Sequence, residues 1–258
     1  MSTMMDAVYN GDVMELAELM RQDPGYKVNV GRGLFGFTLL HHACSRDSRS
    51  PVIPLLLAHP DIDANVKDED GQTPFYLACF FGNTSCVREM LKDSSVKVNE
   101  PNNYGSTPLW QAAVKNHLGV IKWWIASGRE IDLGKPGDVD YKYAIGMAKQ
   151  RGKTEVATLL ERFRIDAAQT RHAMRVELGW YDEAAAEMFA LVVFVSDGLL
   201  QFKDTTTTTP AVRFFKIITQ LPLELQMVLC FRQVGSDKEI IPGKESEVAF
   251  KKLARRLW

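Results

Sequence analysis

The sequence repeats itself at intervals of 34 to 36 residues, and this periodicity restricts the possible folds more than any other feature. The stretch GQTPFYLA, from Gly71 to Ala78, recurs as GSTPLWQA from Gly105 to Ala112, and GFTLLHHA is a looser earlier copy. Alanines at spacings of 36, 35, 34 and 36 extend the series in both directions: Ala7, Ala43, Ala78, Ala112 and Ala148. Such a chain stacks copies of one unit, each of which buries its apolar face against its neighbours.

Each copy carries the signals for two short helices. Thr73 and Thr107 have the residue type that caps helix N-termini, and Pro74 and Pro108 follow at the first helical position. Gly82, after the first predicted helix, suits the left-handed backbone of a helix end. A second run with apolar residues at helical spacing follows in every copy. The pattern therefore predicts a helix, a turn, an antiparallel helix and a projecting hairpin loop.

This unit resembles the ankyrin repeat, whose period is about 33 residues and whose signature is similar to T-P-L-H-x-A. The resemblance covers residues 4–165, or about five repeats. It implies an all-α fold, an ankyrin-repeat α-solenoid of helix-turn-helix repeats with hairpin loops. The first repeat lacks the Thr-Pro pair, and Tyr143-Ala-Ile145 replaces Thr-Pro-Leu in the fifth. Departures at both ends are typical of capping repeats.

The resemblance also implies where a partner binds. Ankyrin proteins use a concave face formed by the hairpin tips and the outer end of the first helix of each repeat. Counted from the anchor alanines, the residues expected to bind a protein partner there are Tyr9, Phe35, Phe37, Arg46, Phe80, Phe81, Tyr104, Lys115 and Arg151. Most of them are aromatic, and large rings are typical anchors of protein interfaces. Alternatively, these rings pack on one another or against the C-terminal segment.

The C-terminal third lacks the repeat. Residues 166–204 are predicted to be a helical extension, and its apolar window Met188–Val195 is too long to lie exposed and too short to span a membrane. We expect this extension to cap the open apolar face of the last repeat. Five threonines, Thr205–Thr209, predict a Thr-rich linker over 205–212. Residues 213–258 then form a separate helical C-terminal segment.

That final segment resembles an F-box, a domain of about 45 residues that opens with an L-P-x-E-L-like motif. Here the motif consists of Leu221, Pro222, Glu224 and Leu225. The resemblance implies that these residues bind a Skp-type adaptor, which would recruit a cullin-type ubiquitin ligase. The alternative is a helical cap packed on the solenoid, and the sequence leaves both open.

No catalytic or metal-binding pattern accompanies the repeats. The sequence has no Gly-rich phosphate loop, no H-E-x-x-H and no G-x-S-x-G motif, so we expect no enzyme activity and no cofactor. His41 occupies the signature histidine of the ankyrin repeat, which usually bonds neighbouring backbone. Cys79 and Cys86 are expected in the core, because no basic residue beside them would activate a thiolate.

Charge and targeting signals limit the classes of partner and the cellular locations expected of this protein. Lys+Arg number 31 and Asp+Glu 32, a formal net charge of −1, which offers no electrostatic reason to expect a nucleic-acid partner. Without a signal peptide or an apolar run of about 20 residues, we expect a cytoplasmic or nuclear protein with no membrane contact. The predicted function is therefore a non-enzymatic protein-protein interaction module, or alternatively a substrate adaptor of a cullin-type ligase, with no small-molecule substrate in either case.

Overall fold

The computed structural model describes residues 3–31, 33, 35–134, 143–196, 214, 215, 217–236, 238, 241 and 243–257. The chain divides into two compact units, Met1–Met174 and Arg175–Trp258. The first unit contains the repeats and the second contains the C-terminal helices. The predicted linker over 205–212 lies outside the described residues.

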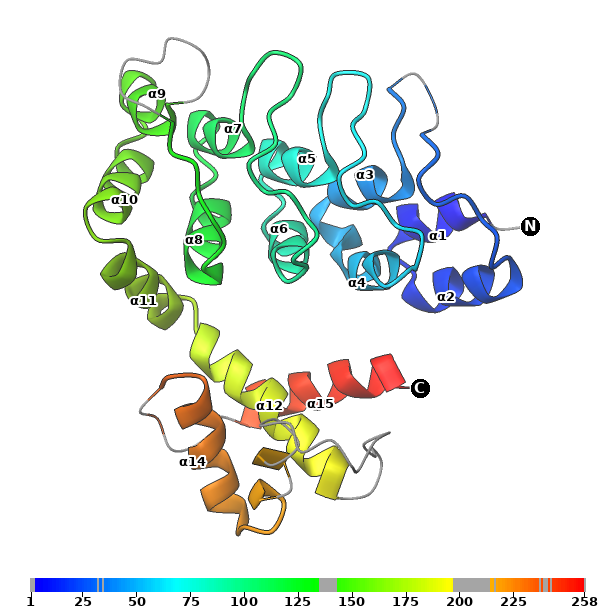
Figure 1. Cartoon of the computed structure of the whole chain (residues 1–258), viewed down its shortest axis with the longest axis vertical. Coiled ribbons are helices and arrows are strands. Elements are labelled where there is room, and N and C mark those ends of the chain that lie inside the picture. Colours follow the sequence, from blue (N-terminus) through cyan, green and yellow to red (C-terminus); the bar gives the residue numbers. More distant parts are fainter. Residues whose placement is uncertain are drawn as a thin grey trace. The chain divides into compact units, whose positions relative to one another are not determined.

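The first unit consists of five stacked helix pairs, counted over the described residues (Figure 1). They are α1 (Met4–Asn10) with α2 (Val13–Gln22), α3 (Leu39–Cys44) with the 3₁₀ helix η1 (Asp47–Val52) and α4 (Ile53–Leu57), α5 (Pro74–Phe81) with α6 (Thr84–Leu91), α7 (Pro108–Val114) with α8 (Leu118–Ser127), and α9 (Ala144–Gln150) with α10 (Thr154–Ile165). The first helices of the pairs, here called the inner helices, form one row from which the loops project. The predicted all-α solenoid of about five repeats is confirmed.

Threonine residues cap four of the inner helices: Thr3 caps α1, Thr38 caps α3, Thr73 caps α5 and Thr107 caps α7. The Oγ1 atoms of Thr38, Thr73 and Thr107 each accept a hydrogen bond from the backbone N–H three residues later, at 3.4, 3.1 and 3.2 Å respectively. The inner helix of the third repeat ends at Gly82, with φ at 74°. A Cβ atom there would lie 2.4 Å from the His117 ring, so both the backbone conformation and the space require glycine.

The anchor alanines lie where neighbouring inner helices meet. All five are fully buried, and each inner helix contacts the next along the chain. Because a methyl group is small, it lets two helix backbones approach closely and leaves the larger apolar residues to fill the space between the two rows. The repeat core is therefore continuous from α1 to α10, as the predicted stacking requires.

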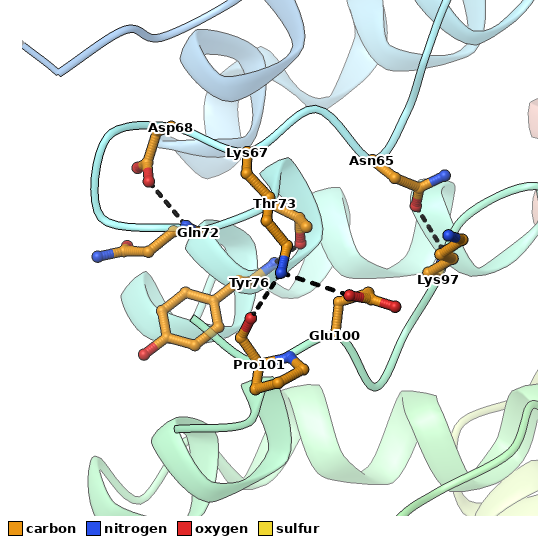
Figure 2. A network of polar contacts seen from close by, with 9 residues as sticks. All are labelled: Asn65, Lys67, Asp68, Gln72, Thr73, Tyr76, Lys97, Glu100 and Pro101. Carbon is orange, nitrogen blue, oxygen red and sulfur yellow. Dashed lines mark hydrogen bonds and ion pairs between the residues drawn. The ribbon is translucent and has the colours of Figure 1, made fainter. Parts of the chain in front are cut away.

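The hairpin loops repeat the same hydrogen bonds. In the third repeat the Asp68 carboxylate accepts from the backbone N–H of Gln72 at 2.7 Å, and in the fourth the Asn102 side chain accepts from that of Ser106 at 3.0 Å. Figure 2 shows the first of these turns beside Lys67, whose Nζ donates to a backbone carbonyl of the next loop at 3.1 Å. Each loop is thus rigid in itself and joined to its neighbour.

Asparagines after the second helices connect successive repeats. Asn65 donates to the carbonyl of Ser95 at 2.9 Å and accepts from the N–H of Lys97 at 2.7 Å (Figure 2). Asn29 makes the same pair of bonds with residues 61 and 63. Because these side chains satisfy backbone groups of the following repeat, they hold the repeats in register.

The second repeat departs from the pattern. Three other copies have a glycine at this position and the fourth repeat has Asn116, whereas the second has Asp47 and continues directly into η1. The Asp47 carboxylate accepts from the backbone N–H of Ser85 at 2.7 Å and from its hydroxyl at 2.8 Å. This carboxylate therefore supports the first turn of α6 in the next repeat.

The second unit has its own core. It contains α12 (Trp180–Ser196), α14 (Leu223–Gln233) and α15 (Gly243–Leu257), while α11 (Ala167–Glu177) crosses the unit boundary. Buried residues of all three helices form one apolar cluster, which includes Phe189, Phe231 and Ala249. None of the described helices is both long and apolar enough to cross a membrane.

The expected role of the 166–204 extension as a cap of the last repeat stays a prediction. The apolar window Met188–Val195 lies in α12, whose strongest contacts are with α14 and α15. The sequence predicts correctly that this helix must be covered, but helical periodicity does not specify the covering partner. The residues on both sides of the predicted linker therefore share one core, and the predicted domain boundaries stay a prediction.

Two adjacent tryptophans provide a test of the repeat core. Trp124 is fully buried, meets Phe75 edge-on at 5.0 Å and donates to the carbonyl of Glu130 at 3.1 Å. Trp123 is half-buried beneath the guanidinium of Arg88 at 4.4 Å. Trp124→Ala should lower the free energy of unfolding by about 3–5 kcal/mol in urea titration. The matched Trp123→Ala should cost about 1 kcal/mol, and equal losses would contradict this core.

Candidate protein-interaction site

An aromatic cluster lies at the start of the repeat array and is here called the first cluster. Phe37 is its centre, stacked on His41 at 5.5 Å, edge-on to His42 at 5.4 Å and tilted against Phe35 at 5.6 Å. A hydrogen bond of 3.1 Å joins the Tyr9 hydroxyl to Nδ1 of His42. The rings pack on one another, as one expectation had it, yet Phe35 remains 59% exposed. The cluster is thus ordered by internal contacts and still open to a partner.

Arg49 supports this cluster from below. Its guanidinium lies 4.3 Å from the centre of the Tyr9 ring, and Nε donates to the Tyr9 carbonyl at 3.1 Å. Nη1 donates to the carbonyl of His42 at 3.0 Å and to the hydroxyl of Ser45 at 3.2 Å. These bonds fix α1 against α3 and orient the Tyr9 ring.

A second cluster lies in the third repeat, at the end of α5. Phe80 and Phe81 meet edge-on at 5.0 Å, and Nζ of Lys115 lies 3.9 Å above the Phe80 ring. Phe81 is 49% exposed, although its helix is otherwise almost entirely buried. Across the described residues, no ring contact joins this cluster to the first.

The other predicted residues of the concave face are also accessible. Tyr104, at the tip of the fourth hairpin, is 69% exposed. Arg46 and Arg151 are exposed, the first beside η1 and the second at the end of α9. The structure thus brings the predicted residues together in two clusters and leaves Tyr104, Arg46 and Arg151 outside them. Whether they bind a partner stays a prediction.

His41 has the role expected of the signature histidine. Its Nδ1 accepts from the backbone N–H of Thr38 at 3.2 Å, and its Nε2 donates to the carbonyl of Gln72 in the next repeat at 3.0 Å. Both contacts fit a neutral ring with its proton on Nε2. The pKa of His41 is lowered to about 4, mainly by burial; the bond to Gln72 offsets part of this effect and the nearby His42 adds to it.

The cysteines are structural in this fold. Cys44, Cys79, Cys86 and Cys230 are all free and buried. Burial raises the pKa of the Cys44 and Cys79 thiols well above the ordinary value, and that of Cys86 to about 12. Such thiols are poor nucleophiles at neutral pH. Over the described part of the chain, no group of three or more His, Cys, Asp or Glu side chains is arranged to hold a metal ion.

Two residues of the first cluster, His42 and Arg49, are not among the residues predicted to bind a partner. The His42 ring joins Tyr9 to Phe37. Its position next to the signature histidine could have identified it. No sequence pattern identifies Arg49, because the direction of its side chain depends on the 3₁₀ turn of η1.

The predicted adaptor-binding residues lie at the start of α14 in the second unit. Pro222 is the N-cap residue, and Leu221 just before it is half-buried. Glu224 is exposed and Leu225 is 49% exposed. The motif therefore lies at a helix start, as expected, with its side chains largely accessible.

Comparisons with known proteins agree with the repeat pattern. A family model of ankyrin repeats (three copies) matches residues 48–135. The SMC5-SMC6 complex localization factor protein 1 of Homo sapiens is 32% identical over 157 residues, which are 57% of this chain and 14% of that protein. The putative ankyrin repeat protein YahD of Escherichia coli (strain K12) is 31% identical over 122 residues, 46% of this chain and 59% of that protein. Rabankyrin-5 of Homo sapiens is 38% identical over 91 residues, 35% of this chain and 8% of that protein.

These matches concern limited segments of the relatives. The chain spans about one seventh of the human localization factor and a smaller share of rabankyrin-5. The similarity therefore identifies the repeats, and the activities of the complete relatives do not follow from it.

The buried histidine predicts a loss of stability in acid. The folded state holds the pKa of His41 at about 4, below the ordinary 6.5, so it favours the neutral ring. The contribution of the neutral His41 ring to the free energy of unfolding is fully present above pH 6.5. It falls by up to about 3 kcal/mol as the pH drops from 6.5 toward 4. His41→Gln should flatten the dependence of the unfolding free energy on pH in this window. His172→Gln, on the exposed side of α11, should leave the dependence unchanged, and an equal effect of both changes would refute the prediction.

Proposed function

This chain is an ankyrin-repeat protein, and from that premise we propose that it is a non-enzymatic module that binds a protein partner through the concave face of its repeats. The observation that carries the proposal is the pair of ordered aromatic clusters with exposed rings. Phe35 and Phe81 keep about half of their surface in water while neighbouring rings hold them in place. Preordered aromatic side chains lose little conformational entropy when a partner covers them.

The polar surroundings of the clusters support the same function. The Tyr9 hydroxyl and the ammonium of Lys115 lie at their edges, held by His42 and Phe80 respectively. An apolar centre with a polar rim is the usual anatomy of a protein interface. The human relative is named as a localization factor of the SMC5-SMC6 complex, and repeats with a binding role would suit a protein of that name.

Substitution of the second cluster tests this function. Phe80→Ala with Phe81→Ala should lower the recovery of the partner at least tenfold, since truncation of an aromatic anchor costs about 2 kcal/mol or more of binding. The measurement is quantitative mass spectrometry of proteins crosslinked to the chain in cells. Ile165→Ala is the matched control, because this side chain on α10 is 81% exposed and lies on a second helix. Unchanged recovery of every partner by a folded double variant would contradict the proposal.

A second candidate function concerns the C-terminal unit. Its support is the exposure of apolar side chains around the F-box-like motif: Leu223 is 52% and Leu225 49% exposed at the start of α14. Two leucines on either side of an exposed glutamate suit a surface that binds a Skp-type adaptor. In this reading the chain is a substrate adaptor of a cullin-type ubiquitin ligase. The cytoplasmic or nuclear location expected from the sequence suits both functions.

Point substitution is the appropriate test, because α12 shares its core with α14 and α15 and deletion of 213–258 would expose that core. Leu225→Asp should abolish binding of a purified Skp-type adaptor in titration calorimetry if the motif is used. Val248→Asp, at an equally exposed site on α15, should leave binding intact. Absence of adaptor binding by the unaltered chain would eliminate this second candidate.

A further inference from the structure

Cations accompany the aromatic rings along one line of the repeats. The carboxyl ends of α3, α5, α7 and α9 line up because each inner helix contacts the next. We call the accessible side chains at these ends the helix-end row: the exposed Arg46, Phe81, Lys115 and Arg151, and the half-buried Phe80. The row contains three positive charges and no carboxylate.

The three cations have no carboxylate partner among the described residues. Asp47, the carboxylate next to Arg46 in sequence, is occupied by the amide and hydroxyl of Ser85. Lys115 contacts the face of the Phe80 ring, which attracts a cation and leaves its charge uncompensated. By contrast Lys149, the penultimate residue of α9, pairs with Glu161 at 2.5 Å.

A fourth cation lies beneath the row. Arg49 is only 8% exposed, and its hydrogen bonds go to two carbonyls and a hydroxyl. No carboxylate contacts it in the described part of the chain. A buried charge without a counter-charge is costly, and the cost would be offset by an anion bound nearby. The exposed Arg46 and the buried Arg49 together make the start of the row strongly positive.

Helix stabilisation does not account for the whole row. Lys115 and Arg151 cap the ends of α7 and α9, where a positive charge interacts favourably with the helix dipole. Arg46, however, follows the C-cap of α3 and directly precedes η1, so the dipoles of these two helices act on its charge in opposite directions. Nor does helix stabilisation require Arg49 to be buried. A common role in binding explains all four cations.

The spacing of the repeats predicts the sequence pattern of a peptide that binds along the row. Packed helices lie about 9 Å apart, so Arg46 and Lys115 are separated by about 18 Å and Lys115 and Arg151 by about 9 Å. An extended chain advances about 3.3 Å per residue. A peptide along the row would therefore place acidic residues about six and three positions apart. An apolar residue about three positions from the first acid would lie over Phe81.

We propose that the helix-end row recognises an acidic, extended peptide segment of the protein partner. Its carboxylates pair with Arg46, Lys115 and Arg151, and an apolar side chain between them packs on Phe80 and Phe81. The inference rests on the proposed function of the concave face and specifies the chemistry of the segment bound there.

Selection from a phage-displayed library of random 12-residue peptides tests the proposed function of the concave face and the acidic-segment proposal separately. The full chain is the target, and the Phe80→Ala, Phe81→Ala chain is used to remove peptides that bind elsewhere. Selected peptides are synthesised, and their dissociation constants are measured by fluorescence anisotropy. The charge variant combines R46Q, K115Q and R151Q. Its matched control combines K27Q, K97Q and R164Q, which neutralises three exposed cations outside the row.

The expected result is that peptides dependent on the aromatic residues carry net negative charge. Their affinity should fall about tenfold in the charge variant and by less than twofold in the control, because each exposed ion pair contributes only a few-fold. Raising the salt concentration to about 0.5 M should weaken binding similarly. If the selected peptides are neutral or basic and bind the charge variant with unchanged affinity, the acidic-segment proposal is overturned and the proposed function stays intact. If no selected peptide depends on the aromatic residues, both fail.

Discussion

The close contact between neighbouring inner helices is the interaction on which the rest of the first unit depends. Fully buried alanines at one position per repeat keep the helices close, so each repeat covers the apolar face of the next. A larger side chain at Ala78 or Ala112 would separate two helices and open the core between the rows. No single repeat could fold alone, since one pair of short helices leaves most of its apolar surface in water.

The polar contacts between repeats follow from this close stacking. His41 reaches a carbonyl in the next repeat, His117 reaches the carbonyl of Phe80, and Asn65 bridges two backbone groups. Each bond is satisfied only at the correct offset, so these side chains specify register more than they add stability. Because these side chains fix the register, the hairpin tips and helix ends are free to vary in charge and in aromatic content. A binding surface can therefore differ in chemistry on the same scaffold.

The second unit follows a different principle. Its core joins α12 to α14 and α15, segments separated in the sequence by residues outside the described part of the chain. Phe250 of α15 contacts both Phe189 and Phe194 of α12. The F-box-like motif therefore occurs at the start of a helix whose other face is already used for folding. Because only the outer face of α14 remains accessible, any adaptor would have to bind Leu223 and Leu225 from that side.

The sequence by itself determined the repeats and their helix starts, because the period, the threonine caps and the recurring alanines are local patterns. Only the tertiary structure decided that Trp124 rather than the adjacent Trp123 is the buried ring, that His42 and Arg49 complete the first cluster, and that α12 packs within the second unit. These choices depend on contacts between residues far apart in the chain. Helical periodicity specifies an apolar face, but the three-dimensional arrangement selects what covers it.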